Sequence, residues 1–315
     1  MDNSLKTIAI GIITCNRPVG LKRLLLSLAN QEITNPDYKM AVIVVDNDIS
    51  GVNESIVNDV KAQTNLDLYF VHETERGIPF ARNASVKKAI DLDADFFIYV
   101  DDDEIAPKNW LQAFINFYDE FKSDISTGPV QGILPDEKLP AWALKSGAYD
   151  KIKAYARGRQ INRAYTNNTM ITKKVLNDMG PCFHPQFRKT GSSDRHYFRQ
   201  AIKRGFNIRW CPEAIIEETV PMERISYMWI LKRAFRSGAG DTISKLLLRK
   251  DTKTIIRIIL LSIARAGYGF IILCGSVFTG WRGFISASKR IAASIGGFLG
   301  LFGINYNEYE KTVGE

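Results

Sequence analysis

Apolar runs alternate with helical patterns along the first part of the chain. Strands are predicted for short apolar runs rich in β-branched residues, at 8–14, 40–45, 68–71 and 96–100. Helices are predicted at 18–28, 52–62, 79–90 and 109–121, most clearly where leucines recur at helical spacing from Leu21 to Leu28. Buried strands alternating with helices indicate a mostly parallel sheet with right-handed crossovers and helices on its faces. The pattern therefore predicts an α/β fold.

The pattern is less regular after residue 121. Further strands are predicted at 127–133, 164–172 and 208–216, with helices at 173–178 and 191–205. Between Pro135 and Arg163 the sequence is irregular and contains seven lysine and arginine residues. Such a stretch suits a loop over an anionic ligand, and it is equally typical of a solvated surface segment.

The fourth predicted strand, 96–100, ends abruptly in the acids Asp101, Asp102, Asp103 and Glu104. Open α/β sheets bind ligands at the carboxyl ends of their strands. Clustered carboxylates repel one another unless a cation lies among them. This stretch alone leaves two interpretations open: a divalent-metal site, or a solvated acidic turn in which Asp103 or a neighbour caps the helix after Pro107.

Other polar residues stand near the ends of the earlier strands or open helices. They are Thr14, Asn16 and Arg17 after the first strand, Asp46 and Asn47 after the second, Arg82 and Asn83 in the helix after the third, and Asp194 at the start of the 191–205 helix. Two more acids, Glu217 and Glu218, end the last core strand. Each of these residues alone is common in a loop. Because polar residues follow one strand after another, the sequence predicts a single crevice at one edge of the sheet.

The composition is that of a globular protein. The chain has 315 residues, 45% hydrophobic and 24% charged, so a large globular α/β domain with an appendage is expected. The four cysteines are scattered, which indicates neither a zinc site nor a disulfide scaffold and suits a reducing cytoplasm. The polar N-terminus and short first apolar run predict no signal peptide, so we expect the catalytic part on the cytoplasmic side.

The net charge of +8 implies an anionic partner, and its distribution favours a membrane surface. Between Lys232 and Arg265 there are nine cations and two acids, next to apolar segments at 255–280 and 291–304. Only 266–280 is free of charge in the first segment, which is short for a membrane span. We therefore expect a domain at 1–221, a basic helical region at 222–315 attached to the membrane interface, and no binding of nucleic acid. A helical hairpin through the bilayer and an ordinary core or oligomer interface stay open as alternatives for the apolar segments.

The ordered motifs of the chain resemble the inverting family 2 glycosyltransferases of the GT-A fold. The matching segments are IITCNRP, VVDN, RGIPFARNAS, FIYVDDDE and GSSD, and the resemblance covers Ile8 to Pro221, about two thirds of the chain. It implies a Rossmann-like, mostly parallel sheet and transfer of a hexose from a nucleotide-diphospho-sugar, with UDP as the expected nucleotide.

The resemblance also implies roles for individual residues. Thr14, Asn16, Arg17, Asp46, Arg82, Asn83, Asp101 and Asp102 are expected to bind the nucleotide-sugar, with Asp46 accepting a hydrogen bond from the base and Asp101 near the ribose or sugar. Asp103, the last acid of the D-x-D pattern, is expected to bind Mn²⁺ or Mg²⁺ across the two phosphates. Asp194 resembles the catalytic base. In an inverting displacement a carboxylate takes the proton of the acceptor hydroxyl, and a divalent ion neutralises the leaving diphosphate.

The sequence departs from the family pattern at two places. Members of the family commonly have Glu-Asp where this chain has Ser193 and Asp194. Many also have a histidine near the phosphates, where this chain has Glu218, which we therefore consider as a second metal ligand beside its alternative as a surface acid. The histidines His72, His184 and His196 form no ligand cluster in the sequence, and we expect His196 to be a polar surface residue.

The sequence-based hypothesis is a glycosyltransferase on the cytoplasmic face of a membrane. It would extend a glycan carried by a polyprenyl diphosphate during surface polysaccharide assembly. Two alternatives stay open: a nucleotidyltransferase using the same crevice, and a catalytically silent membrane-associated protein that binds nucleotide-sugar. A dinucleotide oxidoreductase is disfavoured, because no G-x-G-x-x-G follows the first strand.

Overall fold

The computed structural model describes residues 5–135, 138–149 and 155–307. The strands are β1 Lys6–Thr14, β2 Tyr38–Asp46, β3 Asp67–His72, β4 Phe96–Asp101, β5 Glu104–Ile105, β6 Ile125–Thr127, β7 Val130–Ile133, β8 Gln160–Ile161, β9 Thr169–Thr172, β10 Ile208–Trp210 and β11 Ile216–Thr219. The helices are α1 Pro18–Ala29, α2 Asn53–Gln63, α3 Ile78–Asp91, α4 Trp110–Phe121, α5 Ala141–Ser146, α6 Lys173–Met179, α7 Ser193–Lys203, α8 Tyr227–Leu248 and α9 Thr252–Leu299, with short 3₁₀ turns η1 Pro185–Phe187, η2 Met222–Arg224 and η3 Gly300–Phe302.

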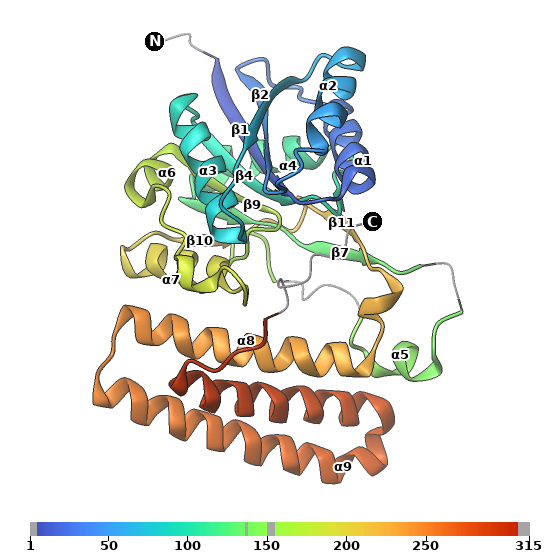
Figure 1. Ribbon diagram of the computed structural model, residues 1–315, viewed down its shortest axis with the longest axis vertical. Coiled ribbons are helices and arrows are strands. Elements are labelled where there is room, and N and C mark those ends of the chain that lie inside the picture. Colours follow the sequence, from blue (N-terminus) through green and yellow to red (C-terminus); the bar gives the residue numbers. More distant parts are fainter. Residues whose placement is uncertain (1–4, 136–137, 150–154, 308–315) are drawn as a thin grey trace.

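The upper part of the molecule is a three-layer α/β unit (Figure 1). Its eight-stranded sheet has the order β3-β2-β1-β4-β9-β6-β10-β8, in which β3, β2, β1 and β4 are parallel. β9 runs antiparallel to both β4 and β6. Separate apolar clusters fill the two faces, because the strand residues are apolar on both sides. The predicted α/β fold with a mostly parallel sheet is confirmed.

A smaller sheet, β5-β11-β7, lies at the end of the large one. It corrects two of the predicted strands, since 127–133 and 208–216 each form two strands in different sheets. The chain leaves the large sheet at Pro129 and at Pro212, where the missing backbone N–H prevents the ladder from continuing. These crossings bring Glu218 on β11 beside Glu104 on β5, which is its register partner.

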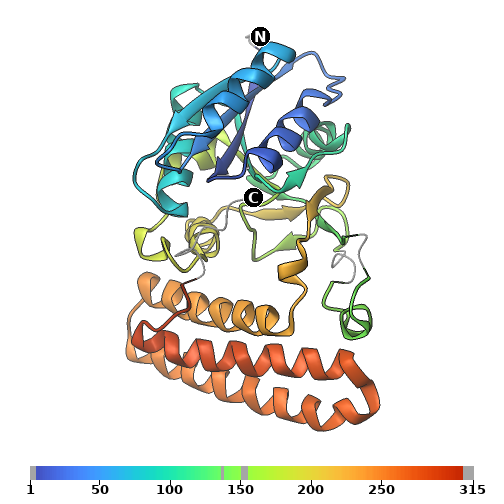
Figure 2. The same cartoon turned by 45° about the vertical axis from the view of Figure 1, so that its right-hand side comes forward.

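The C-terminal region is a layer of long helices beneath the α/β unit (Figure 2). α8 passes under α7, and α9 forms a hairpin whose two arms run side by side (Figure 1). The chain reverses at Gly280, whose backbone angles, φ 58° and ψ −144°, are not helical. The second arm begins before the predicted apolar segment 291–304 and includes Arg282, Lys289 and Arg290.

Glycines set the spacing between α8 and α9. A Cβ added at Gly238 would lie 2.0 Å from the carbonyl oxygen of Ala293, and one at Gly296 would lie 2.0 Å from that of Phe235. Thr242 also donates a hydrogen bond of 2.8 Å to the carbonyl of Gly297. The two backbones are thus in direct contact, and side chains larger than hydrogen do not fit between them.

Candidate functional site

The acidic stretch lies where the two sheets meet. β4 ends at Asp101, the chain turns through Asp102 and Asp103, and β5 begins with Glu104. Glu104 is fully buried and accepts a hydrogen bond of 2.9 Å from the backbone N–H of Asp101, which closes the turn. The cap alternative does not describe this turn, because α4 begins after Asn109 and has no side-chain cap.

Three arginines surround these carboxylates. Arg17 lies 3.0 Å from Asp102 and 3.5 Å from Asp103, measured between nitrogen and carboxylate oxygen. Arg224 binds both candidate metal ligands at once. Its guanidinium lies 3.1 Å from Asp103 and 2.5 Å from Glu218. A further pair, between Arg82 and Asp101, has a separation of 3.8 Å.

Burial changes the acidity of the cluster. The pKa of Asp101 is raised to about 7 by burial and by repulsion from Asp103 and Asp102, while Arg82 opposes the rise. The pKa of Asp102 is raised to about 6 by burial, against the attraction of Arg17. Burial, with repulsion from Asp103, also raises the pKa of Glu218. Burial therefore favours the neutral form of these carboxyl groups, and a cation bound among them would favour the ionised form.

The residues present fit a divalent cation. Asp103 and Glu218 approach each other closely enough for one guanidinium to contact both. Carboxylate oxygens are the ligands that Mg²⁺ and Mn²⁺ prefer. Within the described ranges no group of three or more such side chains forms a complete metal site, so oxygens of a ligand or of water would have to complete the coordination.

Ser193 accounts for one departure from the family pattern. It is fully buried, and its hydroxyl accepts a hydrogen bond of 2.9 Å from Arg82. Arg82 in turn faces Asp101 and the ring of Phe183. The serine thus joins α7 to α3 and orients the guanidinium that faces Asp101.

A cleft of about 600 Å³ opens beside the acidic cluster. It brings together four of the predicted site residues, Arg82, Asp101, Asp194 and Glu218. The rest of the lining is rich in arginines, which come from three parts of the chain and which we call the arginine wall: Arg163, Arg195, Arg233 and Arg236. The last two lie on α8, so the C-terminal region completes this cleft.

The other predicted residues lie outside the cleft lining. Arg17, Asp102 and Asp103 stand beside it in the ion-pair network. Thr14 is buried next to Asp46 at the end of β1, and Asn16 is exposed with a φ of 53°.

Two of the predicted nucleotide-sugar ligands form hydrogen bonds within the protein. Asp46 is fully buried, and its carboxylate accepts hydrogen bonds from the backbone of Asp48 and from Asn53, so it fixes the loop before α2. Asn83 forms a reciprocal pair with the backbone of Phe183 and holds the loop before η1. Both side chains are engaged because turns after strands need partners for their own backbone groups.

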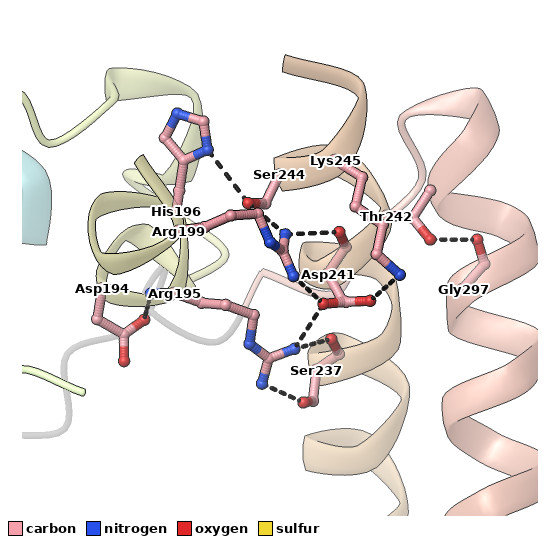
Figure 3. Close-up of polar contacts among 10 residues, drawn as sticks. All are labelled: Asp194, Arg195, His196, Arg199, Ser237, Asp241, Thr242, Ser244, Lys245 and Gly297. Carbon is pink, nitrogen blue, oxygen red and sulfur yellow. Dashed lines mark hydrogen bonds and ion pairs between the residues drawn. The ribbon is translucent and has the colours of Figure 1, made fainter. Parts of the chain in front are cut away.

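The α7 helix is clamped onto α8, which corrects the prediction for His196. This residue is 3% exposed, and its Nδ1 lies 3.1 Å from the hydroxyl of Ser244 (Figure 3). Burial lowers its pKa to about 4. Arg195 donates to the carbonyl and hydroxyl of Ser237, and Arg199 contacts Asp241 at 2.5 Å.

The sequence did not indicate Arg224, Arg195, Arg233 or Arg236 as site residues. Arg224 lies on η2, ahead of α8, and the positions of the other three depend on the packing of α8 under α7, which brings together segments about 40 residues apart. A basic first half of α8 was visible in the sequence and was assigned to the membrane alone. Part of the basic stretch 135–163, including Lys151 and Lys153, lies outside the described residues.

Comparison with known sequences identifies the family. Glycosyl transferase family 2 matches residues 9–180, which is more than half of the chain. The chain belongs to this family. Among curated proteins, it is similar to the succinoglycan biosynthesis protein ExoM of Rhizobium meliloti (strain 1021), with 29% identity over 238 residues, or 76% of this chain and 75% of that protein. The enzyme is thus a glycosyltransferase, as its motifs predicted.

Comparison with solved structures confirms the fold. The mannosyltransferase PcManGT from Pyrobaculum calidifontis, solved with GDP-Man and Mn²⁺, superposes with a TM-score of 0.60 at 16% identity, covering 93% of this chain and 87% of that one. S. aureus TarS 1–349, solved with UDP, gives a TM-score of 0.53 at 17% identity, covering 98% and 95%. The glycosyltransferase therefore has the GT-A fold.

Proposed function

We propose that this glycosyltransferase moves a hexose, with inversion, from a nucleotide-diphospho-sugar to a lipid-linked glycan at a membrane surface. The observation that carries the proposal is the cleft itself. One wall presents Asp101, Glu218 and Arg82, while Asp194 stands among the arginines of the other wall. A donor at the acidic wall and an acceptor at Asp194 would meet inside the same 600 Å³ space.

Asp194 is suited to take the proton of the acceptor hydroxyl. Its Oδ1 accepts a hydrogen bond of 2.7 Å from the N–H of Arg195, which fixes the carboxylate at the start of α7 (Figure 3). Among the described residues its Oδ2 has no hydrogen-bond partner, so this oxygen is left to receive the proton. Half-buried, Asp194 lines the cleft and lies within reach of a sugar bound there.

The donor would lie along the acidic wall. Arg82, held by Ser193, is placed to pair with a phosphate or the sugar beside Asp101. Asp103 and Glu218 would hold Mn²⁺ or Mg²⁺, which supplies Lewis-acid neutralisation of the leaving diphosphate. The D-x-D acids and the donor nucleotides of the solved relatives support this arrangement, and UDP is the expected nucleotide.

The C-terminal helices support attachment to a membrane. The helix Thr252–Phe302 is long and apolar enough by composition to cross a bilayer, and only 11% of its most apolar window is buried. Because the chain reverses at Gly280, we propose that the hairpin lies in the interface on the cytoplasmic side. Val277 and Phe278 at its turn are 84% and 92% exposed, and lysines and arginines flank the apolar surface.

We further propose that residues 1–221 form the catalytic domain and that 222–315 attach it to the membrane. Similarity to a succinoglycan biosynthesis protein supports a role in surface polysaccharide assembly, with a polyprenyl diphosphate as the expected carrier. In this arrangement α8 belongs to both parts, since its arginines line the cleft while its glycines contact α9.

A panel of nucleotide-sugars tests the proposal, scored by thermal shift with and without Mn²⁺ or Mg²⁺. One donor is expected to stabilise the protein in the presence of metal, by about 2.7 kcal/mol when its concentration is about 100 times its Kd. That donor should then release nucleoside diphosphate during transfer. Release of inorganic diphosphate would instead indicate a nucleotidyltransferase, and binding without turnover would indicate the silent binding protein.

A further inference from the structure

A second cavity continues the catalytic cleft toward the C-terminal helices. It has a volume of about 410 Å³ and lies between the loop 162–165, helix α7 and the helices α8 and α9. The two cavities share lining residues, among them Arg163, Tyr165, Arg195 and Ser237. The second cavity contains none of Asp101, Asp194 or Glu218, so it is distinct from the reacting centre. We call it the α7–α9 groove.

The α7–α9 groove is positively charged. Four arginines line it, Arg163, Arg195, Arg199 and Arg265, together with a single acid, Asp241. Asp241 is already paired with Arg199 at 2.5 Å and with Lys245 at 2.8 Å. These attractions, against the cost of burial, hold the pKa of Asp241 at about 2, so it stays ionised and anchors α7 to α8. The lining therefore has three positive charges in excess.

Two of the four arginines are available for a ligand. Arg195 and Arg199 are bound to Ser237, Asp241 and Ser244 of α8, as Figure 3 shows. Within the described part of the chain, Arg163 and Arg265 form no hydrogen bond or ion pair, although they line the same groove from segments about 100 residues apart. Two exposed guanidinium groups that line one groove, whose lining acid Asp241 is already paired, favour a ligand with two adjacent negative charges.

We propose that the α7–α9 groove binds the diphosphate of the lipid-linked acceptor. This inference rests on the proposed function. The glycan would extend from the groove along the shared wall to Asp194, and the lipid would leave across α9, which supplies Arg265 and Ala293 to the groove. Leu261, which is 46% exposed, lies one helical turn before Arg265 on the same face of α9, so apolar surface adjoins the phosphate site. The donor diphosphate belongs to the opposite, acidic wall.

Binding of farnesyl diphosphate to the full-length protein in neutral detergent tests the proposal. The variant Arg163→Ala/Arg265→Ala is expected to bind it at least about tenfold more weakly than the wild type, because it lacks two charge-assisted contacts. Arg257→Ala is the matched control, since Arg257 is exposed on the same helix and lies outside the groove lining. Its affinity for farnesyl diphosphate should equal that of the wild type.

Other results of the binding and transfer measurements would contradict the proposed diphosphate site or the proposed function. Equal affinity of the wild type and the double variant would overturn the proposal, because neither guanidinium group would then contribute to binding. If inorganic diphosphate bound as tightly as farnesyl diphosphate, the proposal that the ligand is lipid-linked would be overturned. In transfer assays, Arg265→Ala, whose side chain lines the groove and not the catalytic cleft, should raise the KM for the lipid-linked acceptor and leave the KM for the donor unchanged. Absence of transfer in the wild type would refute the proposed function. The affinity for farnesyl diphosphate would still show whether the α7–α9 groove binds a lipid diphosphate.

Discussion

The two walls of the cleft are built in opposite ways. The acidic wall comes from one continuous turn between β4 and β5, with Glu218 added by a neighbouring strand. The arginine wall is assembled from the 162–165 loop, α7 and α8, and its residues are separated by tens of positions in the chain. One wall stands at the ends of strands and is mostly local in sequence, whereas the other depends on helices docked against each other.

This difference suggests that the two walls respond differently to change. The carboxylates are held by backbone hydrogen bonds and by Arg17, Arg82 and Arg224, so a single substitution there alters the local charge. The arginine wall depends on the contacts of α7 with α8 and of α8 with α9. Changes at the α8–α9 contact, which lies outside the cleft lining, should therefore reach Asp194.

The largest effect is expected for Asp194→Asn. Loss of the general base should reduce transfer by at least about 1,000-fold, while donor binding measured by thermal shift with Mn²⁺ stays within a factor of two of the wild type. The carboxamide keeps the size of the side chain, so folding should be unaffected. Transfer within tenfold of the wild type, or simultaneous loss of donor binding, would contradict the assignment of Asp194.

Substitution at the α8–α9 contact tests the second wall. A Cβ at Gly238 would lie 2.0 Å from a backbone oxygen of α9, so Gly238→Ala should lower the free energy of unfolding by about 3 kcal/mol. It should also reduce transfer, because α8 supplies Arg233 and Arg236 to the cleft. Gly267→Ala is the matched control, as a Cβ there meets no atom within 4 Å. Equal unfolding curves for the two variants would refute the close contact.

The clamp between α7 and α8 predicts a pH dependence. His196 has a folded-state pKa of about 4 against an ordinary value of 6.5, so the unfolded state takes up the proton first as the pH falls. Between pH 7 and pH 5, the wild type should lose about 2 kcal/mol of unfolding free energy relative to His196→Gln. Comparison of the two proteins at each pH removes the opposite contributions of Asp101 and Asp102, whose pKa values are raised. A constant difference across this range would contradict the burial of a neutral imidazole.

The smallest effect is expected at Arg224. Its guanidinium contacts both Asp103 and Glu218, so Arg224→Gln should remove a competing cation and tighten Mn²⁺ binding about tenfold, as measured by metal-dependent thermal shift. Arg204→Gln removes an exposed ion pair with Asp178 instead and should leave Mn²⁺ affinity unchanged. Weaker Mn²⁺ binding in Arg224→Gln would show that the guanidinium supports the metal site instead of competing with it.

The sequence predicted the acidic wall better than the arginine wall for a physical reason. Apolar strands ending in polar residues are local signals, and parallel strands necessarily bring their ends to one edge, as for Asp101. The positions of Arg195 and Arg236 depend on how α7 and α8 pack, which no local pattern specifies. His196 shows the same limit, because a polar residue on a helix looks exposed until another helix covers it.

Two strand predictions are wrong at the points where the chain passes from one sheet to the other. The segments 127–133 and 208–216 are continuous in hydrophobicity, but each divides at a proline and pairs with different neighbours. Asp46 and Asn83 are residue types that can bind a ligand, and in the structure their side chains form hydrogen bonds with neighbouring loops. Partner choice among polar groups is thus decided by the tertiary structure, which residue type and position alone do not fix.

The stereochemistry of transfer tests the central claim most directly. With the donor identified from the nucleotide-sugar panel, NMR of the anomeric proton of the newly transferred sugar shows whether its configuration has changed. A single base, Asp194, facing a donor held at the acidic wall predicts inversion, so an α-linked donor should give a β-linked product. Retention of the donor's configuration would contradict direct displacement in this cleft.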